Sequence, residues 1–363
     1  MRKLALACFL LLAGSTLASA GTQAALPASS PSPPQAATTS GVVPRVRLLA
    51  TGGTISNRRG GRLTAEELVA SVPGLPDVAR VQAEQFANVG SSELTLDQWL
   101  ALSRRVNALF RDEPDLAGIV VTSGTDTLEE LAYFLHLTVR DRRPVVVTGA
   151  MRNPSQVGYE GPANLLASFR VAAAPAAAGR GVLVVLNDEI NGARDVTKTD
   201  ALRLHTFAAR NFGALGVVDA DRVVFRRSAE GRHTAAAEFD VESIASLPRV
   251  DAFLVYQGAS GDLIKAAVDL GARGVVMATA GAGAVSGTQG EGLAYARGKG
   301  VPVVSTTRAG SGRIAPPREP SPPGVSPRIA AGDLSAVKAR VLLMLALTRT
   351  TDPTELQRIF DEY

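Results

Sequence analysis

The chain has few cysteine, histidine and aromatic residues for its length. Its 363 residues include one cysteine and three histidines, and only 5% of them are aromatic. Cys8 lies within an apolar run at the extreme N-terminus, where we expect it to be removed together with a signal peptide. A mature chain without cysteine excludes a thiol nucleophile, disulfides and thiolate metal sites.

Other absences narrow the kind of site further. The sequence contains no H-E-x-x-H and no paired His/Asp spacing, so metal ligation has no support. "ARGKG" ends without the Ser or Thr of a phosphate-binding loop, and "GAGAVSG" is one residue too long for G-x-G-x-x-G. No basic cluster with interleaved aromatic residues occurs and the net charge is +4, so we expect no nucleic-acid partner.

The N-terminus has the features of an export signal. Residues 1–20 combine a basic start, a short apolar run and the small residues Ala18, Ser19 and Ala20 before the expected cleavage site. The run is too short to span a bilayer comfortably. Residues 21–43 are rich in Pro, Ser, Ala and Thr and cannot bury enough apolar surface to fold. We therefore predict an exported protein, periplasmic or secreted, with no membrane segment after signal cleavage.

Beyond Pro44 the sequence alternates between β-branched runs and helical patterns. Runs such as "VRLLATGGT", "AGIVVTSGTDT", "RPVVVTGAM" and "RGVLVVLND" are continuously apolar, as in strands covered on both faces. Strands that alternate with helices predict parallel βαβ units. The predicted fold is α/β, with a large N-terminal domain (44–227) of mostly parallel sheet and flanking helices. A linker (228–248) and a smaller C-terminal α/β domain (249–363) with a parallel sheet follow.

Several helices are predicted with their caps. "TLDQWLALSRRVNALF" predicts a helix with Thr95 as its N-cap. "TLEELAYFLHLTV" predicts a second helix with Leu128, Leu131 and Leu135 on one face. "SAVKARVLLMLAL" and "DPTELQRIF" predict two helices at the end of the chain, the last one capped by Asp352.

Three of the predicted strands end in a small residue or a hydroxyl followed by glycine. "TGGT", "TSGTDT" and "TGAM" should meet in one crevice, because ligands of open α/β sheets bind at the carboxyl ends of the strands. Glycine turns there leave backbone N–H groups open to a carboxylate or an oxyanion. Thr54 and Thr125 would place hydroxyls beside those groups. Taken singly, each motif favours a turn in which Thr54 or Asp126 only caps a helix; two such motifs at neighbouring strand ends favour a site.

A hydroxyl nucleophile needs an activating partner. No histidine lies in a catalytic pattern and no G-x-S-x-G elbow occurs, so a Ser-His-Asp hydrolase is not expected. A lysine close to a carboxylate is the remaining common activator. "GARDVTKTD" supplies Lys198 beside Arg194, Asp195 and Asp200, although this spacing is also that of an ordinary surface loop.

The segments "LLATGGTIS", "VVTSGTDTLEELAYFL", "RPVVVTGAMR" and "NGARDVTKTDALRLHTF" together resemble the bacterial-type L-asparaginases, in particular their exported type II branch. The resemblance extends from about Arg45 to the end of the chain. It implies hydrolysis of L-asparagine to L-aspartate and ammonia, with side activity on L-glutamine and with no metal or organic cofactor. It also implies a homotetramer built as a dimer of dimers, whose active sites lie between subunits.

The resemblance implies roles for individual residues. Thr54 would be the nucleophile that forms an acyl-enzyme, and Thr125, Asp126 and Lys198 would activate the nucleophile or the attacking water. Asp126 would hold the substrate α-amino group, Ser91 its α-carboxylate, and the backbone of Ala150 its side-chain amide. The full set of implied substrate-binding residues is Gly53, Ser91, Ser92, Thr125, Asp126, Ala150 and Glu319, the last of them acting across a subunit interface.

The sequence departs from the family pattern in three places, one of which is the proline-rich text around Glu319, "RIAPPREPSP". Relatives usually carry a tyrosine on a mobile lid soon after T-G-G-T, whereas all five tyrosines here follow Thr125. Tyr159, in "SQVGYEGP", is the available substitute. The family's asparagine from the neighbouring subunit is absent around "YQGASGD", where Gln257 and Ser260 are the alternatives.

Two other interpretations are kept beside the enzyme. A periplasmic amino-acid-binding protein would share the export signal, the two α/β domains and the carboxylate-binding turns. Binding alone, however, would need neither Thr54 nor Lys198. The third interpretation is a family member that has lost activity together with the lid tyrosine.

Overall fold

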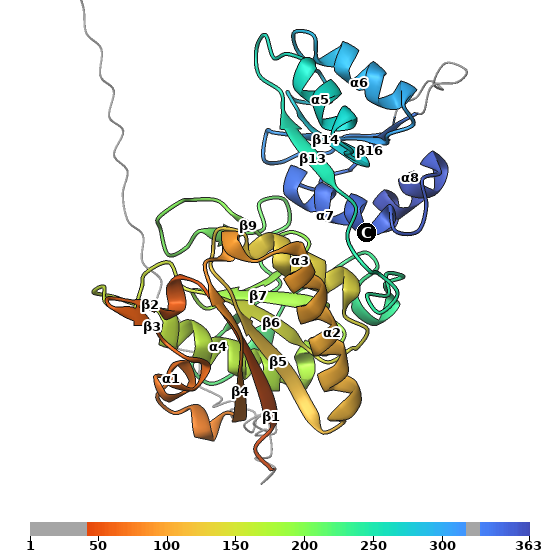
Figure 1. The fold of residues 1–363 in the computed structure, drawn as a ribbon. Coiled ribbons are helices and arrows are strands. Elements are labelled where there is room, and N and C mark those ends of the chain that lie inside the picture. The colour runs from red at the N-terminus through yellow and green to blue at the C-terminus, as the bar shows by residue number, and fades with distance from the viewer. Residues whose placement is uncertain (1–41, 317–326) are drawn as a thin grey trace, which may run out of the picture. The chain divides into compact units, whose positions relative to one another are not determined.

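The computed structural model describes residues 42–316 and 327–363 (Figure 1). The predicted signal peptide, nearly all of the segment 21–43 and Glu319 lie outside the described residues. In the described ranges, no helix combines the length and the apolar character needed to cross a membrane.

The N-terminal part is built on a mixed, mostly parallel sheet. Strands β4, β1, β5, β6 and β7 run parallel to one another, and β8, β11 and β12 continue the sheet in antiparallel fashion. In spatial order the strands are β12 (Val223–Phe225), β11 (Gly216–Val218), β8 (Glu189–Gly192), β7 (Val182–Leu186), β6 (Val145–Thr148), β5 (Leu116–Thr122), β1 (Arg45–Gly52) and β4 (Arg80–Val89).

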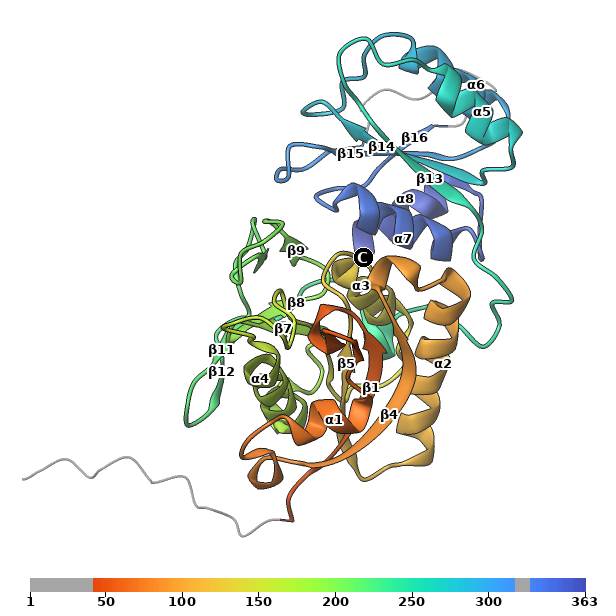
Figure 2. The same cartoon turned by 60° about the vertical axis from the view of Figure 1, so that its left-hand side comes forward.

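The C-terminal part has a smaller sheet of four parallel strands with helices on both faces. Its strands are β13 (Val250–Leu254), β14 (Gly274–Thr279), β15 (Val303–Thr307) and β16 (Arg328–Ala330). Figures 1 and 2 show α5 (Asp262–Asp269) and α6 (Gln289–Gly298) on one face, and α7 (Ala336–Ala346) and α8 (Pro353–Glu362) on the other. The predicted fold class, a large and a small α/β domain, is therefore confirmed.

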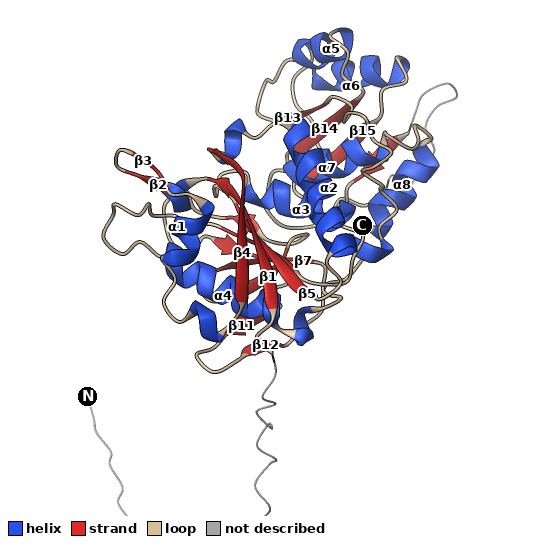
Figure 3. Cartoon of the chain, turned by 60° about the horizontal axis from the view of Figure 1, so that its bottom comes forward, coloured by secondary structure: helices blue, strands red, loops and turns tan. Residues whose placement is uncertain are grey.

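Continuous apolar strands follow from the burial of both faces of the large sheet. In β5, Ile119 and Val121 belong to the core that also contains residues of α2 (Leu96–Asp112) and α3 (Leu128–Thr138). Val120, between them, belongs to a second core with α4 (Gly161–Ala173). Alternate residues of a strand point to opposite faces, so each residue of the run is buried. Figure 3 shows the strands lying between the helices.

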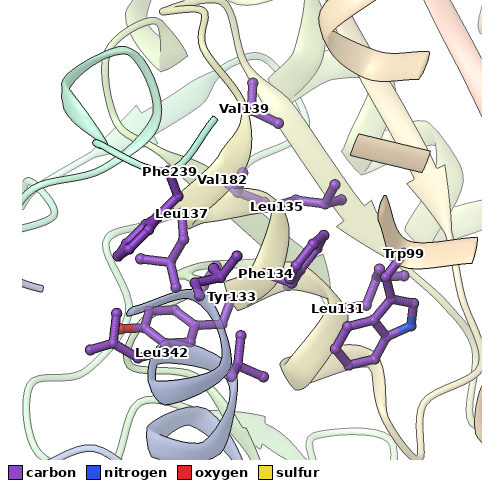
Figure 4. Packing of buried hydrophobic residues seen from close by; sticks show 14 of the residues in the cluster. Trp99, Leu131, Tyr133, Phe134, Leu135, Leu137, Val139, Val182, Phe239 and Leu342 are labelled. Carbon is purple, nitrogen blue, oxygen red and sulfur yellow. The ribbon is translucent and has the colours of Figure 1, made fainter. Parts of the chain in front are cut away.

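The predicted helix caps are confirmed, but α3 is buried more completely than one apolar stripe would require. Thr95 and Asp352 each accept a hydrogen bond from the third backbone N–H of their helix. Helix α3 contacts β6, β7 and α7, and nearly all of its residues are buried. Figure 4 shows Tyr133 and Leu137 of this helix in the core with Leu342 of α7. A helix that is packed on several sides has no face exposed to solvent, so its sequence shows no regular alternation of apolar and polar residues.

Strand β4 is absent from the sequence-based prediction because it lies at the sheet edge. Most of its residues are only partly buried, and charged residues such as Arg80 and Glu84 interrupt its apolar pattern. The remaining short elements are helix α1 (Ala65–Ala70) and the strand pairs β2 (Asn57–Arg58) with β3 (Gly61–Arg62) and β9 (Thr197–Lys198) with β10 (Phe207–Ala208).

Candidate active site

The loops that follow β1, β4 and β5 meet through glycines. The Gly53 N–H donates to the Val89 carbonyl at 2.8 Å, and Gly53 has a φ of 87°, which disfavours residues with a side chain. A Cβ atom at Gly53 would collide with the backbone of Gly124, and one at Gly124 would crowd the Ser91 side chain. The glycines thus bring the three loops into contact at the carboxyl ends of neighbouring parallel strands, where ligands of such sheets bind.

Thr54 follows this contact directly and opens a fixed turn. It is the first residue of the short 3-10 helix η1 (Thr54–Ser56), and its side chain is half-buried. The Ser56 hydroxyl donates to the Gly53 carbonyl at 3.1 Å and closes the turn. The N-cap of the next α-helix is Thr64, with a complete capping box. The alternative in which Thr54 serves as an α-helix cap is therefore wrong.

Lys198 joins the two groups with which it was predicted to act. Its Nζ donates to Thr125 Oγ1 at 3.0 Å and to Asp126 Oδ1 at 2.6 Å. The Lys198 side chain is 14% exposed, whereas the Asp126 side chain is 76% exposed. An ammonium group is thus held in a largely desolvated position beside a hydroxyl, and the carboxylate that neutralises it faces solvent.

Asp126 and Ser91 make different contacts at the start of α3. The N-cap residue of this helix is Thr127, and no side-chain hydrogen bond caps the helix, so the capping role considered for Asp126 is wrong. The Thr127 N–H donates instead to the buried Ser91 hydroxyl, at 3.3 Å. Ser91 and Asp126 therefore flank the same helix start, one close to backbone N–H groups and the other beside the lysine.

Glu129 fixes the backbone of Lys198 from α3. Its Oε1 accepts from the Thr197 hydroxyl at 2.9 Å and from the Lys198 N–H at 3.2 Å. Glu129 is buried in the first turn of α3, four positions after Thr125, so the loop that enters this helix carries the hydroxyl and the helix carries the clamp on its partner. The sequence gives no signal for this role of Glu129, because an acidic residue in the first turn of a helix is ordinary.

Lys338, in the C-terminal part of the chain, holds the segment that leads to Lys198. This residue of α7 is 2% exposed, and its Nζ donates to the carbonyls of Arg194, at 2.8 Å, and Val196. The Nζ also lies 4.0 Å from Glu129 Oε2. Burial lowers the pKa of the Lys338 ammonium to about 8, against the opposing attraction of Glu129. The one signal for this role in the sequence is a lone lysine within the apolar run of "SAVKARVLLMLAL".

The neighbouring Glu130 gives a testable pH dependence of stability. Burial raises its pKa from 4.5 to about 7, although Arg340 Nη1 lies 3.9 Å away; the Glu129 charge adds to the rise. A raised pKa means that the neutral carboxyl stabilises the fold, fully below pH 4.5 and less and less as the pH rises through 7. We expect the free energy of unfolding to fall between pH 5 and 8, by at most about 3 kcal/mol from this group.

Denaturant unfolding of the wild type and of Glu130→Gln at pH 5 and pH 8 measures this contribution. The variant should lose less stability across that interval than the wild type. Glu66→Gln, on the exposed face of α1, is the matched control. Its free energy of unfolding should change between pH 5 and pH 8 by as much as that of the wild type. An equal change in the free energy of unfolding for Glu130→Gln and the wild type would show that Glu130 is ionised in the folded protein from pH 5 to pH 8.

The other predicted substrate-binding residues are placed as follows. Ser92 is exposed next to Ser91, and Ala150 is fully buried after β6. A Cβ atom at Gly149 would approach Thr125 Cγ2 to 3.3 Å, which places the Ala150 loop beside the Thr125 loop.

The two alternatives for the family asparagine lie in the C-terminal part. Gln257 and Ser260 are exposed in the loop after β13, where the Ser260 hydroxyl accepts from the Asp262 N–H at 3.1 Å. In the described ranges, no hydrogen bond or ion pair joins this loop to Thr125, Asp126 or Lys198. Glu319 lies outside the described residues.

The hollow at the lysine is open rather than enclosed. A depression of about 340 Å³ is lined by Asp126, Lys198, Thr199, Asp200 and Ala201. A larger cavity of about 520 Å³ lies elsewhere, between the Arg194–Asp333 ion pair and the C-terminal Tyr363. The larger cavity touches neither Thr54 nor Lys198, so we place the site by its chemistry and not by cavity size. Among the described residues, no group of three His, Cys, Asp or Glu side chains is arranged to hold a metal.

The fold and the site define a two-domain α/β protein with a threonine–lysine–aspartate group at the carboxyl ends of parallel strands. Comparison with known families gives two matches. Residues 45–231 match the model of the asparaginase N-terminal domain, and residues 249–360 match that of the glutaminase/asparaginase C-terminal domain. The chain therefore belongs to the asparaginase family.

Individual relatives are similar over most of their length. L-asparaginase 2 of Bacillus subtilis is 42% identical over 331 residues, covering 88% of this chain and 87% of the relative. A probable periplasmic L-asparaginase of Haemophilus influenzae is 38% identical over 330 residues, covering 88% and 93%. The crystal structure of a probable cytoplasmic L-asparaginase from Campylobacter jejuni superposes with a TM-score of 0.83 at 38% identity. It covers 88% of this chain and 100% of that one.

Proposed function

We propose that this protein hydrolyses the side-chain amide of L-asparagine to L-aspartate and ammonia, with Thr54 as the nucleophile. One observation carries the proposal: Lys198 Nζ lies within hydrogen-bond distance of both Thr125 Oγ1 and Asp126 Oδ1. A site that only binds an amino acid has no need of a desolvated ammonium beside a hydroxyl. Family membership supports the same reaction.

The reaction proceeds in two steps. The Thr54 hydroxyl oxygen attacks the amide carbon, its proton passes through the Thr125–Lys198 pair to the leaving nitrogen, and the C–N bond breaks to release ammonia. This leaves an aspartyl ester on Thr54. Water then attacks the ester carbon, gives a proton to the Thr54 oxygen through the same pair, and aspartate departs. Backbone N–H groups of the glycine turns stabilise the oxyanion in both steps.

The charged ends of the substrate set its orientation. The α-carboxylate needs hydrogen-bond donors, which Ser91, Ser92 and the N–H groups around them supply. The α-ammonium needs an acceptor, and the exposed Asp126 carboxylate is the one beside Lys198. Gly53 and the Ala150 backbone face the amide, and Glu319 completes the site from another subunit.

Ammonia release with different substrates tests the proposal. Ammonia should form fastest from L-asparagine and more slowly from L-glutamine, whose extra methylene changes transition-state binding by about 1–3 kcal/mol. D-Asparagine and buffer alone serve as controls. Tight L-asparagine binding without ammonia release would instead support the amino-acid-binding interpretation or an inactive family member.

Export and assembly belong to the same proposal. The sequence pattern of residues 1–20 supports export to the periplasm or beyond, and one relative is named periplasmic, whereas the C. jejuni protein is named cytoplasmic. The open hollow at Lys198 is consistent with a site completed by a second subunit in a homotetramer. Cell fractionation with N-terminal sequencing tests the first point. The mass in solution, followed against activity on dilution, tests the second.

A further inference from the structure

The segment that follows Thr54 is short and has little packing of its own. It forms the β2–β3 hairpin, in which Asn57 pairs with Arg62 and Arg58 pairs with Gly61. Most residues of this hairpin are exposed. An isolated two-stranded hairpin is marginally stable in water, so the hairpin needs support from elsewhere in the fold.

The loop 152–160 supplies that support through two hydrogen bonds. The Tyr159 hydroxyl donates to the Ile55 carbonyl at 2.6 Å, within the turn that Thr54 opens. The Arg59 N–H, at the tip of the hairpin, donates to the Ser155 hydroxyl at 2.8 Å. One loop therefore holds both the turn that Thr54 opens and the tip of the hairpin that follows it.

The supporting loop is itself stiffened by internal hydrogen bonds. The Ser155 N–H donates to Asn153 Oδ1 at 2.9 Å, and the Arg152 guanidinium donates to the Gly158 carbonyl at 3.1 Å. The Glu160 carboxylate accepts from the Met151 N–H at the base of the loop. These bonds hold the loop in one conformation, so that the groups that contact Ile55 and Arg59 have fixed positions.

The chemistry of Tyr159 suits a permanent anchor. Burial raises the pKa of its hydroxyl, with a further contribution from the Glu160 charge, so the hydroxyl stays a donor at neutral pH. Ile55 is fully buried, and its carbonyl oxygen needs a partner inside the protein. The hydroxyl is committed to that carbonyl and acts on Thr54 only through the backbone.

We propose that Tyr159 and Ser155 anchor the Thr54 turn and the β2–β3 hairpin to the loop 152–160, so that this chain holds its nucleophile with a fixed support. Tyr159 is in this sense a positioning residue. The inference rests on the proposed function only for the role of Thr54; the anchor itself is a property of the folded chain.

The test is Tyr159→Phe, which keeps the ring and removes the hydrogen bond. We expect amide hydrogen exchange of residues 54–62 to become faster, because the turn loses its tie to the loop. We expect kcat for L-asparagine to fall by about tenfold to a hundredfold, as for other small misplacements of a reacting group. KM should stay within about threefold, since the charged ends of the substrate bind elsewhere.

Two further variants isolate the effect. Tyr295→Phe removes a hydrogen bond of the same 2.6 Å length, to Asp269 in the C-terminal part, and should change neither exchange of residues 54–62 nor kcat. Ser155→Ala should accelerate exchange at the hairpin tip and lower kcat less than Tyr159→Phe.

The outcomes separate the anchor from the proposed function. Unchanged exchange in Tyr159→Phe overturns the anchor, whatever its activity. Faster exchange with unchanged kcat overturns its role in positioning the nucleophile. If the wild type releases no ammonia from L-asparagine, the proposed function fails, and hydrogen exchange still decides the anchor.

Discussion

Thr54→Ala is expected to lower ammonia release from L-asparagine by roughly a thousandfold or more, because the variant has no hydroxyl to form the ester. The turn should survive the change. Gly53 makes the close contact with Gly124, and the Ser56 hydroxyl closes the turn without the Thr54 side chain. Binding of L-asparagine, measured by calorimetry, should persist, since the charged ends of the substrate contact other residues.

Thr54→Ser is the matched control for this prediction. It restores a hydroxyl at the same atom position and removes only a methyl group, so measurable activity should return. An alanine variant with wild-type kcat would remove Thr54 from the mechanism. A serine variant as inactive as the alanine variant would indicate that the loss comes from disturbed structure instead.

Lys198→Met should have the second-largest effect. Methionine fills a similar volume but supplies no ammonium to Thr125 Oγ1, 3.0 Å away in the native chain. Loss of a positioned acid–base group costs about 10²–10⁴-fold in rate, and we expect kcat for ammonia release to fall by that amount. The fold should change little, because Glu129 holds the Lys198 backbone and not its side chain.

Lys265→Met provides the comparison. Lys265 pairs with Asp262 at 3.3 Å on the surface of α5, so its replacement should leave kcat unchanged. Circular dichroism and thermal unfolding of both variants check the fold. If Lys198→Met keeps more than about a tenth of wild-type kcat while folded, the Thr125–Lys198 pair is not the acid–base group.

The strand ends could be predicted from sequence because the signal is local. Continuous β-branched runs identify buried parallel strands, and such strands place their carboxyl ends along one edge. Thr54 and Thr125 were therefore expected in one crevice. Lys198, which meets Thr125 although they are 73 positions apart, was joined to it only by the family resemblance. The caps of α2 and α8 were found for the same reason, since a cap is a short motif.

The supporting residues could not be predicted because their roles depend on tertiary contacts. Glu129 and Lys338 bind residues 194–198 mostly through backbone groups, and a backbone partner leaves no side-chain pattern in the sequence. The sequence suggested Tyr159 only as a substitute for the lid tyrosine. Its hydroxyl contacts Ile55, 104 positions away, which no spacing rule specifies.

The covalent step is tested most directly by locating the substrate's acyl group on the protein. The wild type and Thr125→Val, in which water attack should be slower, are mixed with L-asparagine, quenched in acid, digested with pepsin and sequenced by tandem mass spectrometry. We expect an aspartyl ester on Thr54 in at least one of the two proteins. An ester on another hydroxyl, or ammonia release with no ester on Thr54 in either protein, would contradict it.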